Sequence, residues 1–187
     1  MSKKSKFTGE QRRNYILQLL KNSSQPITGQ KLADETGVSR QVIVTDIALL
    51  RTANEPIIST NSGYLYLQEN ESNQSYRRIV ACKHSREQTK EELDMIVDCG
   101  VTVVNVIVEH PFYGDLTGSL MLKSRLEVEK FYNDLMENKF TLLAALTDGV
   151  HLHTLEADSL EKLDAATKAL SEAGILISDD PRKNNNV

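Results

Sequence analysis

Among the segments of this chain, Gly149-Val150-His151-Leu152-His153 says most about the fold. Asp148 and Gly149 form a turn sequence before it, and the alternation that follows is typical of a β-strand. Side chains two residues apart in a strand point to the same face, so both imidazoles are expected to lie together and to be able to hold one metal ion. The chain has four histidines, which all follow residue 83: His84, His110, His151 and His153.

The composition is that of a globular protein with one large domain or two small ones. The chain has 187 residues, 40% of them hydrophobic, which is enough to bury a core in either case. Two cysteines, Cys82 and Cys99, are too few for a disulfide framework, and no apolar run is long enough to span a bilayer. The lysines after Met1 are not followed by the hydrophobic region of a signal peptide, so we expect a cytoplasmic protein.

Charge is distributed unevenly along the chain. The formal net charge is -4, but the residues up to Arg78 contain 11 Lys and Arg against 7 Asp and Glu, a net of +4, and the remainder has a net of -8. A basic N-terminal part favours a polyanionic partner such as DNA, because binding to phosphates releases counterions. The alternative is an ordinary solvated surface whose charges are uneven by chance.

The N-terminal part contains the start and stop signals of three helices. Thr8-Gly-Glu-Gln11 has the spacing of a capping box and predicts the start of the first helix. Thr28, two residues after Pro26, can cap a second helix. Gly37 then supplies a tight turn, and Ser39 can cap a third helix. The predicted order is helix, helix, turn, helix.

The third predicted helix has a core face and an outer face. Ile43, Ile47 and Leu50 recur at helical spacing and are expected to be buried. The outer residues near its N-terminus lie where a recognition helix contacts the major groove, and Arg and Gln can bond to guanine and adenine edges while Val and Thr methyl groups pack on thymine. The predicted DNA-binding residues are Ser39, Arg40, Gln41, Val44 and Thr45.

A short β-hairpin is expected after the third helix. Residues 56–60 and 64–67 have the pattern of two strands around the turn Asn61-Ser-Gly63. With the preceding turn Thr36-Gly-Val-Ser-Arg40, this order resembles the winged-helix domains of bacterial transcription regulators, in which the hairpin is the wing. The alternative is a three-helix packing unit with no role in DNA binding.

The rest of the chain alternates between strand and helix patterns, which predicts a sheet covered on one side by helices. We expect strands at 77–82 and 101–108, the second in the centre of the sheet, helices at 89–99, 124–138 and 159–173, and a β-hairpin from 141–146 and 150–155. The predicted fold class is α+β, an N-terminal winged helix-turn-helix joined to a C-terminal α/β sandwich. The predicted domains are 1–70 (DNA-binding), 71–76 (linker), 77–178 (regulatory) and 179–187 (disordered tail).

A metal site in the second domain needs ligands besides the two strand histidines. His84 is expected just after the first strand, and Glu92 lies one turn into the helix that follows. Three imidazoles and one carboxylate suit a transition metal such as zinc, nickel or iron better than calcium or magnesium. Two alternatives stay open: Thr89-Lys-Glu-Glu92 is itself a capping box that would give Glu92 a local role, and Cys82 can replace His84 as a ligand.

The order of these segments resembles the NiaR family of niacin-responsive repressors, a winged helix followed by a three-histidine domain. The resemblance extends from about Arg12 to Ile177, and its motifs are Val80-Ala-Cys-Lys-His84, Val106-Ile-Val-Glu-His-Pro-Phe-Tyr-Gly114, Leu122-Lys-Ser-Arg125 and Leu146-Thr-Asp-Gly-Val-His-Leu-His-Thr154. It implies a homodimer that binds operator DNA and represses genes of NAD synthesis and niacin salvage or uptake, with nicotinic acid as co-repressor. It also implies one divalent metal per chain, favouring nickel, on His84, Glu92, His151 and His153.

Nicotinic acid offers a pyridine nitrogen to an open position on the metal, and a carboxylate that needs a cation or backbone donors. The candidate contacts are His110, Lys123 and Arg125, although the last two can equally be a solvated helix start. One alternative function is a regulator that responds to the metal itself. Another is a metal-dependent enzyme acting on a small carboxylate, with Glu109 or Asp148 as general base, although no nucleophile motif or phosphate-binding loop accompanies them.

Overall fold

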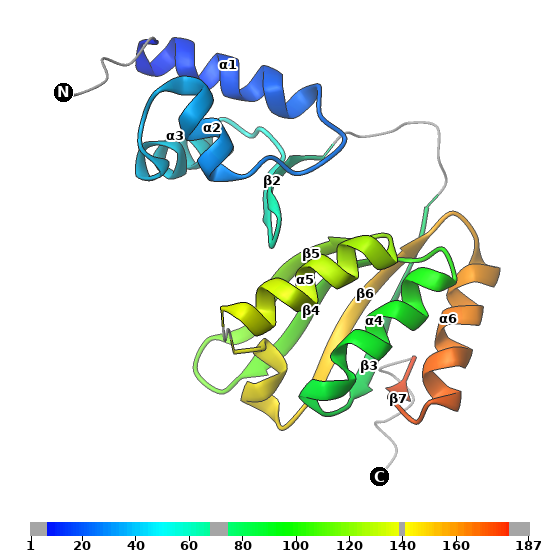
Figure 1. The fold of residues 1–187 in the computed structure, drawn as a ribbon. Helices are drawn as coiled ribbons and strands as arrows, with labels where there is room; N and C mark the ends of the chain where they lie inside the picture. Colours follow the sequence, from blue (N-terminus) through cyan, green and yellow to red (C-terminus); the bar gives the residue numbers. More distant parts are fainter. Residues whose placement is uncertain (1–6, 68–74, 139–140, 180–187) are drawn as a thin grey trace. The chain divides into compact units, whose positions relative to one another are not determined.

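The computed structural model of the chain describes residues 7–67, 75–138 and 141–179 (Figure 1). Contacts divide the chain into two compact units, Met1–Glu71 and Ser72–Val187. Among the described helices, none is long and apolar enough to cross a membrane. The predicted linker at 71–76 lies outside the described residues up to residue 74, and strand β3 begins at Tyr76. The predicted tail at 179–187 lies outside them from residue 180 onward.

The N-terminal unit is a winged helix-turn-helix. Its elements are α1 (Gly9–Lys21), α2 (Gly29–Thr36), α3 (Arg40–Thr52), β1 (Ile57–Thr60) and β2 (Gly63–Tyr66), and the two strands pair antiparallel. All three predicted caps are confirmed. Thr8 and Gln11 form the reciprocal capping box of α1, while the Thr28 and Ser39 hydroxyls accept from the backbones of α2 and α3. Gly37 ends α2 with a φ of 70°, a left-handed conformation that glycine adopts without strain.

The helices of this unit pack around an apolar core that includes Ile16, Leu32, Ile43 and Ile47. One ion pair inside it is almost free of solvent. Asp46 of α3, 2% exposed, accepts from the Nε of Arg12 at 2.5 Å and lies 3.6 Å from the Nη1 of Arg13. The pair joins α1 to α3 and therefore helps to hold the outer face of α3 in place.

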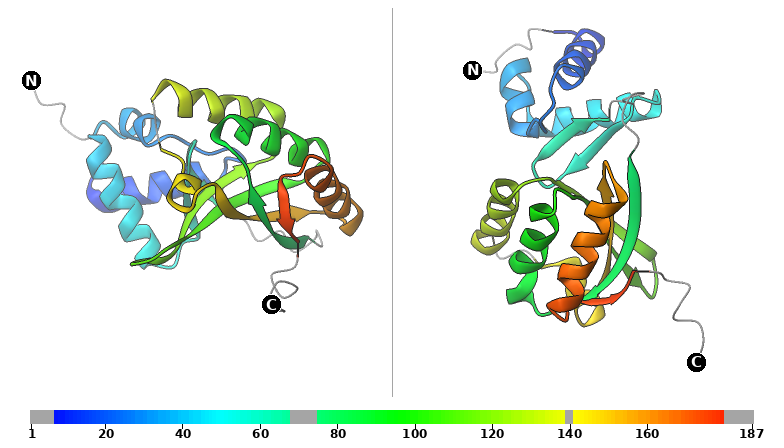
Figure 2. Two further views of the ribbon diagram at one scale, coloured as in Figure 1. Left: turned by 90° about the horizontal axis from the view of Figure 1, so that it is seen from below. Right: turned by 90° about the vertical axis from the view of Figure 1, so that its right-hand side faces the viewer.

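The C-terminal unit is an antiparallel five-stranded sheet in the order β5-β4-β6-β3-β7. Its elements are β3 (Tyr76–Lys83), the 3₁₀ turn η1 (Arg86–Gln88), α4 (Thr89–Asp98), β4 (Thr102–His110), β5 (Gly114–Leu122), α5 (Arg125–Glu137), the 3₁₀ turn η2 (Leu143–Thr147), β6 (Val150–Ala157), α6 (Leu160–Glu172) and β7 (Leu176–Ser178). Helices α4, α5 and α6 cover one face, which confirms the predicted sandwich, and the other face carries no described helix (Figures 1 and 2).

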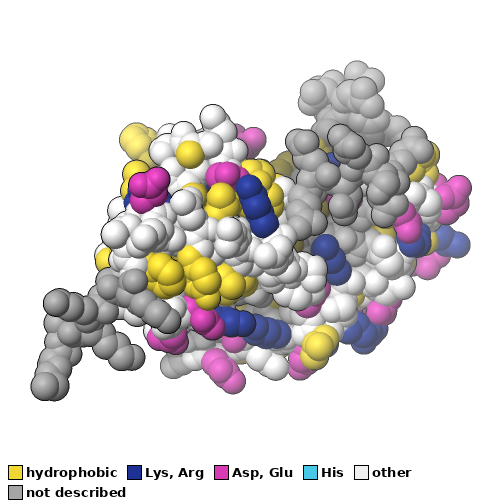
Figure 3. Space-filling model, turned by 90° about the horizontal axis from the view of Figure 1, so that it is seen from above, with side chains coloured by type: hydrophobic (Ala, Val, Ile, Leu, Met, Phe, Trp, Pro, Cys, Tyr) yellow, Lys and Arg dark blue, Asp and Glu magenta, His cyan; other side chains and the backbone are white. Residues whose placement is uncertain are grey.

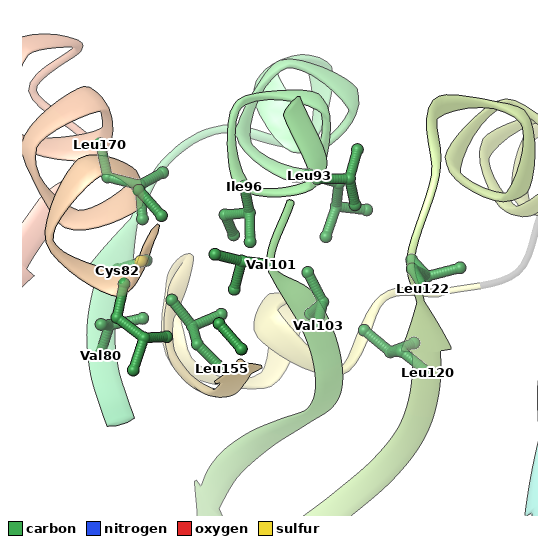
Figure 4. Close-up of a cluster of buried hydrophobic side chains, with 14 of the residues drawn as sticks. Val80, Cys82, Leu93, Ile96, Val101, Val103, Leu120, Leu122, Leu155 and Leu170 are labelled. Atoms are coloured by element: carbon green, nitrogen blue, oxygen red, sulfur yellow. The ribbon is translucent and has the colours of Figure 1, made fainter. Parts of the chain in front are cut away.

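The core of this unit lies between the sheet and the helices. Val80 and Leu155 from the strands belong to the same apolar cluster as Leu93 and Ile96 of α4, as Figure 4 shows. Burial of one such side chain stabilises a fold by about 1.5–3 kcal/mol. The functional side chains described below are at the edge of this same layer, so the core also positions them.

The predicted β-hairpin at 141–155 is wrong. Leu143–Thr147 forms a 3₁₀ turn, and β6 pairs with β3 and β4 instead of with a hairpin partner. Ala144 and Ala145 favour helical backbone over strand, and the segment has no polar and apolar alternation to fix a strand face. The backbone N–H of Gly149 donates to the carbonyl of Ala144, which closes the turn.

The central strand predicted at 101–108 is confirmed as β4, which lies between β5 and β6, although β6 is the middle strand of the five. Two strands were absent from the prediction, β5 and β7. A signal for β5 was available, since Leu116, Leu120 and Leu122 recur at even spacing, but its glycines and the apolar Met121 between two of the leucines weaken the strand pattern. β5 pairs with β4 as a hairpin.

Candidate metal centre and nucleic-acid interface

Three imidazoles converge on one buried carboxylate in the C-terminal unit. Glu92 Oε2 lies 2.7 Å from the Nε2 of His84 and 3.4 Å from the Nε2 of His153, and Glu92 Oε1 lies 3.2 Å from the Nε2 of His151. The potential ligand atoms of His84, Glu92 and His151 all lie within 4.8 Å of one another. The sequence thus predicted a set of residues that the fold brings together.

Each of the three rings is oriented by a second hydrogen bond. The Nδ1 atoms lie 2.7 Å from the carbonyl of Ser85, 2.9 Å from that of Gly149 and 2.7 Å from that of Asn105, for His84, His151 and His153 respectively. A carbonyl can only accept, so Nδ1 carries the proton and the neutral ring has its lone pair on Nε2. Metal-binding histidines are held in this way, with the second nitrogen on a backbone or carboxylate acceptor.

Local features of the chain explain why the rings meet. His151 and His153 share the helix-covered face of β6, as the strand pattern predicted. Gly149 has a φ of 86°, and a Cβ there would lie 2.5 Å from the carbonyl oxygen of His84. The turn can therefore approach His84 only because residue 149 has no side chain. A bulge in β4 near Asn105 turns that carbonyl toward His153.

The electrostatics of the cluster require a positive charge at its centre. Glu92 is 1% exposed, and burial alone would raise its pKa, but the neighbouring histidines outweigh burial and hold the pKa well below its usual value. Burial lowers the pKa of His84 and His153, and Glu92 reverses this, so both pKa values lie above 6.5. Imidazole lone pairs facing a carboxylate need protons or a cation between them. The residues present fit a transition metal, which prefers imidazole nitrogen with carboxylate oxygen.

The structure bears on the two alternatives to this ligand set, a capping role for Glu92 and Cys82 as a ligand in place of His84. The capping role of Glu92 is wrong, because Gln88 is the N-cap of α4 and the reciprocal box is formed by Ser85 and Gln88, one turn earlier. Cys82 does face the cluster, but burial and then the charge of Glu92 raise the pKa of its thiol. Among the described residues, the group whose ligand atoms lie close enough to share one ion contains His84, Glu92 and His151 and not Cys82, which favours His84 over Cys82.

The three candidate contacts for nicotinic acid lie elsewhere in the unit. His110 ends β4 and its Nδ1 accepts from the backbone of Phe112 and Tyr113. Arg125 donates to Asp98, and the Lys123 backbone donates to Glu127. Among the described residues, none of the three lines the cavities beside the histidines.

Two cavities adjoin the cluster, and their walls include residues that sequence reasoning missed. The inner one, about 40 Å³, is lined by Glu92, His151 and His153 and by apolar side chains that include Phe131 and Leu143. The outer one, about 220 Å³, is lined by residues of η1, η2 and the Asp148-Gly149 turn, including Arg86. Four residues line both: His84, Thr89, Leu142 and Ala144. No local pattern points to these wall residues, because they come from separate segments.

The predicted DNA-binding residues form the exposed N-terminal part of α3. Ser39 caps the helix, Arg40 and Gln41 open it, and Val44 is 38% exposed. Ile43, Ile47 and Leu50 are buried as expected. Arg51 donates to the carbonyl of Ile57 and to the Ser59 hydroxyl, which ties α3 to the wing. The geometry is that of a recognition helix with its wing.

The face shown in Figure 3 has no patch of described side chains that is basic throughout. On the face shown in Figure 3, the described Lys and Arg side chains are interspersed with Asp and Glu and with apolar residues. The case for DNA binding therefore rests on the helix geometry more than on net charge.

Comparison with known proteins agrees with this division. A family model of an HTH domain matches residues 12–65, and a family model of a 3H domain matches residues 77–179. The chain is similar to the transcription repressor NadR of Bacillus subtilis strain 168, with 48% identity over 180 residues that cover 96% of this chain and 100% of that protein. It is also similar to the probable transcription repressor NiaR of Thermotoga maritima, with 42% identity over 174 residues that cover 93% and 98% of the two chains.

Proposed function

The chain belongs to the NadR/NiaR family of DNA-binding transcription repressors, and from that premise we propose that nicotinic acid is its co-repressor. Membership of that family makes it a regulator and not an enzyme. The proposed targets are genes of NAD synthesis and niacin salvage or uptake. The single observation that carries the proposal is the convergence of three imidazoles and Glu92 beside a cavity of about 220 Å³.

The proposed metal ligands are His84, Glu92, His151 and His153, holding one divalent transition metal per chain, with nickel as the favoured ion. Their oriented Nε2 atoms and buried carboxylate supply both the donors and the compensating negative charge. Such an ion can act as a Lewis acid toward a nitrogen donor when its coordination is open.

The proposed DNA contacts are Ser39, Arg40, Gln41, Val44 and Thr45. We propose that the protein acts as a homodimer in the cytoplasm, whose two recognition helices read half-sites about one helical turn apart in a near-palindromic operator. Nicotinic acid raises operator affinity only if it binds the DNA-competent arrangement of the dimer better than the other arrangements.

A regulator that responds to the metal itself is the second candidate. The four side chains are themselves enough to complete a tetrahedral shell, and a closed shell leaves no position for an effector. In that case the ion is the signal or a structural element, and nicotinic acid has no metal-bound role.

An operator-binding assay that crosses nicotinic acid with chelation separates these functions. Mobility shifts at fixed salt, with a duplex selected by the protein from a random pool, give the dissociation constant in all four conditions. We expect nicotinic acid to tighten binding only in the metal-loaded protein. If nicotinic acid does not change the operator dissociation constant, the co-repressor role is contradicted. If the dissociation constant changes only when the metal is removed, the second candidate is favoured.

A further inference from the structure

Thr89 has a buried hydroxyl without a partner. The residue is 5% exposed, and among the described residues its Oγ1 has no hydrogen-bond partner. Buried hydroxyl groups are almost always hydrogen-bonded, because an unsatisfied one loses its interactions with water and gains nothing in return. Asp94 also has one unpartnered oxygen, but its other oxygen is paired with Lys90 at 2.8 Å. Thr89 has no comparable compensation.

The position of Thr89 at the start of α4 explains why the protein does not satisfy it. In the body of a helix a threonine hydroxyl donates to the carbonyl one turn earlier. For Thr89 that turn is η1, where the Ser85 carbonyl already accepts from the Nδ1 of His84 and the backbone of Gln88, and the Arg86 carbonyl accepts from the Thr89 backbone. The N-cap position belongs to Gln88, whose side chain accepts from the backbone of Ser85 at 3.2 Å. The hydroxyl is thus left for a group that is not part of the described chain.

The hydroxyl is placed where the two cavities meet. Thr89 lines the inner cavity, which contains Glu92, His151 and His153, and the outer cavity of about 220 Å³. Leu142 and Ala144 also line both and give the junction an apolar wall. Arg86 is the one guanidinium or ammonium group among the described residues of the outer cavity, and Asp148 is its one carboxylate. An anion is therefore favoured beside Arg86 and disfavoured beside Asp148.

We propose that Thr89 and Arg86 bind the carboxylate of a small aromatic acid at this junction. The Thr89 hydroxyl donates to one carboxylate oxygen, Arg86 supplies the positive charge, and the ring packs on Leu142 and Ala144 with its edge toward the histidine cluster. The inference rests on the proposed function, since it takes nicotinic acid as the ligand, and it assigns the carboxylate to residues other than Lys123 and Arg125. The expected ligand is a planar acid with one carboxylate. Thr89 and Arg86 can bind one carboxylate, and Asp148 in the same cavity would repel a second.

Calorimetric titration of the metal-loaded full chain with nicotinate tests the assignment. Thr89→Val removes the hydroxyl and keeps the shape, and we expect the affinity to fall about 10- to 100-fold, the loss typical of one hydrogen bond to a charged acceptor. Thr89→Ser restores the donor and should restore binding. Arg86→Met should reduce nicotinate binding and leave the affinity for nicotinamide, which has no charge, unchanged. Thr117→Val, an exposed strand position, is the matched control.

Two further measurements keep a structural role apart from a binding role. Metal content should stay the same in Thr89→Val, and thermal unfolding without ligand should not be lowered, because removing an unsatisfied hydroxyl removes an unfavourable group. A lower unfolding temperature with unchanged nicotinate affinity overturns the inference. If the wild type binds nicotinate and the Thr89→Val and Arg86→Met variants bind it equally well, the inference fails while the proposed function stands. If wild type does not bind nicotinate, the proposed function fails and the assignment fails with it.

Discussion

The two units of this protein differ in the burial of their proposed functional side chains. In the N-terminal unit the residues of α3 that we propose to contact DNA are exposed on one helix and are close together in the chain. In the C-terminal unit Glu92, His151 and His153 are buried and come from two elements, α4 and β6, that are far apart in the sequence. An exposed helix face tolerates substitution without loss of fold, whereas a buried polar cluster ties function to stability. The two units are therefore expected to respond differently to the same kind of change.

The largest expected effect is at the buried cluster. Changing both His151 and His153 to alanine removes two of the proposed ligands, and we expect the protein to lose its metal and its response to nicotinic acid. Basal DNA binding should remain, because the recognition helix belongs to the other unit. Metal analysis and mobility shifts measure the two properties in the same preparation.

Two results would contradict this assignment. A double variant that keeps its metal has other ligands, with Cys82 and His110 as the candidates. A variant that loses the metal and still responds to nicotinic acid shows that the ion is structural and that the pyridine nitrogen does not bind it.

Removing a buried charge from the N-terminal unit should lower the stability of that unit and leave metal binding by the other unit unchanged. Asp46→Ala leaves Arg12 without its partner in a nearly dry site, which is expected to destabilise the fold by about 3 kcal/mol. Chemical unfolding followed by circular dichroism measures the loss, and metal content should not change. The control is Asp34→Ala, because Asp34 is exposed and, within the described part of the chain, its side chain accepts from Gln30 alone. Equal stability of the two variants would mean that the ion pair contributes nothing to the unit.

A smaller effect is expected at the exposed face of α3. Arg40→Ala or Gln41→Ala should weaken operator binding by about 1–3 kcal/mol if the side chain makes a bidentate base contact. Unfolding temperature should not change, since both side chains are exposed. Duplexes with single base changes decide the role: a contact to a base relaxes specificity at one position, and a uniform loss over all duplexes assigns the side chain to phosphate.

The most gradual effect is that of pH. The pKa values of His84 and His153 lie above 6.5, since Glu92 overcomes the lowering by burial, so protons compete with the metal as soon as the pH falls through these raised values. Each ligand that must lose a proton reduces metal affinity about tenfold per pH unit below its pKa. The same shifts stabilise the metal-free fold below pH 6.5, and this stabilisation is lost as the pH rises through the folded pKa values.

Competition with a chromogenic chelator at several pH values measures this dependence. Residues 1–71 contain no histidine, so basal DNA binding should not follow the same curve. A metal affinity that is flat across this range is incompatible with imidazole ligands.

Local signals in the sequence were enough to predict the elements of the N-terminal unit and the orientation of the side chains on β6. Caps at Thr8, Thr28 and Ser39 and the turn at Gly37 act within four residues, so their outcome does not depend on the rest of the fold. Alternation along β6 likewise placed His151 and His153 on one face. The positions of His84 and Glu92 after the first strand of the unit suggested them as further ligands, the family resemblance implied the same set, and the structure brings them to the same cluster.

Tertiary structure alone decided what surrounds that cluster. Glu92 meets histidines 59 and 61 positions away because β6 lies between β3 and β4, an order that no local pattern encodes. The 3₁₀ turn at Leu143–Thr147 replaced an expected strand and became a cavity wall, since backbone preference there competes with packing against the sheet. The unpartnered Thr89 hydroxyl exists only in this folded context, because hydrogen-bond satisfaction depends on every element that meets at the site.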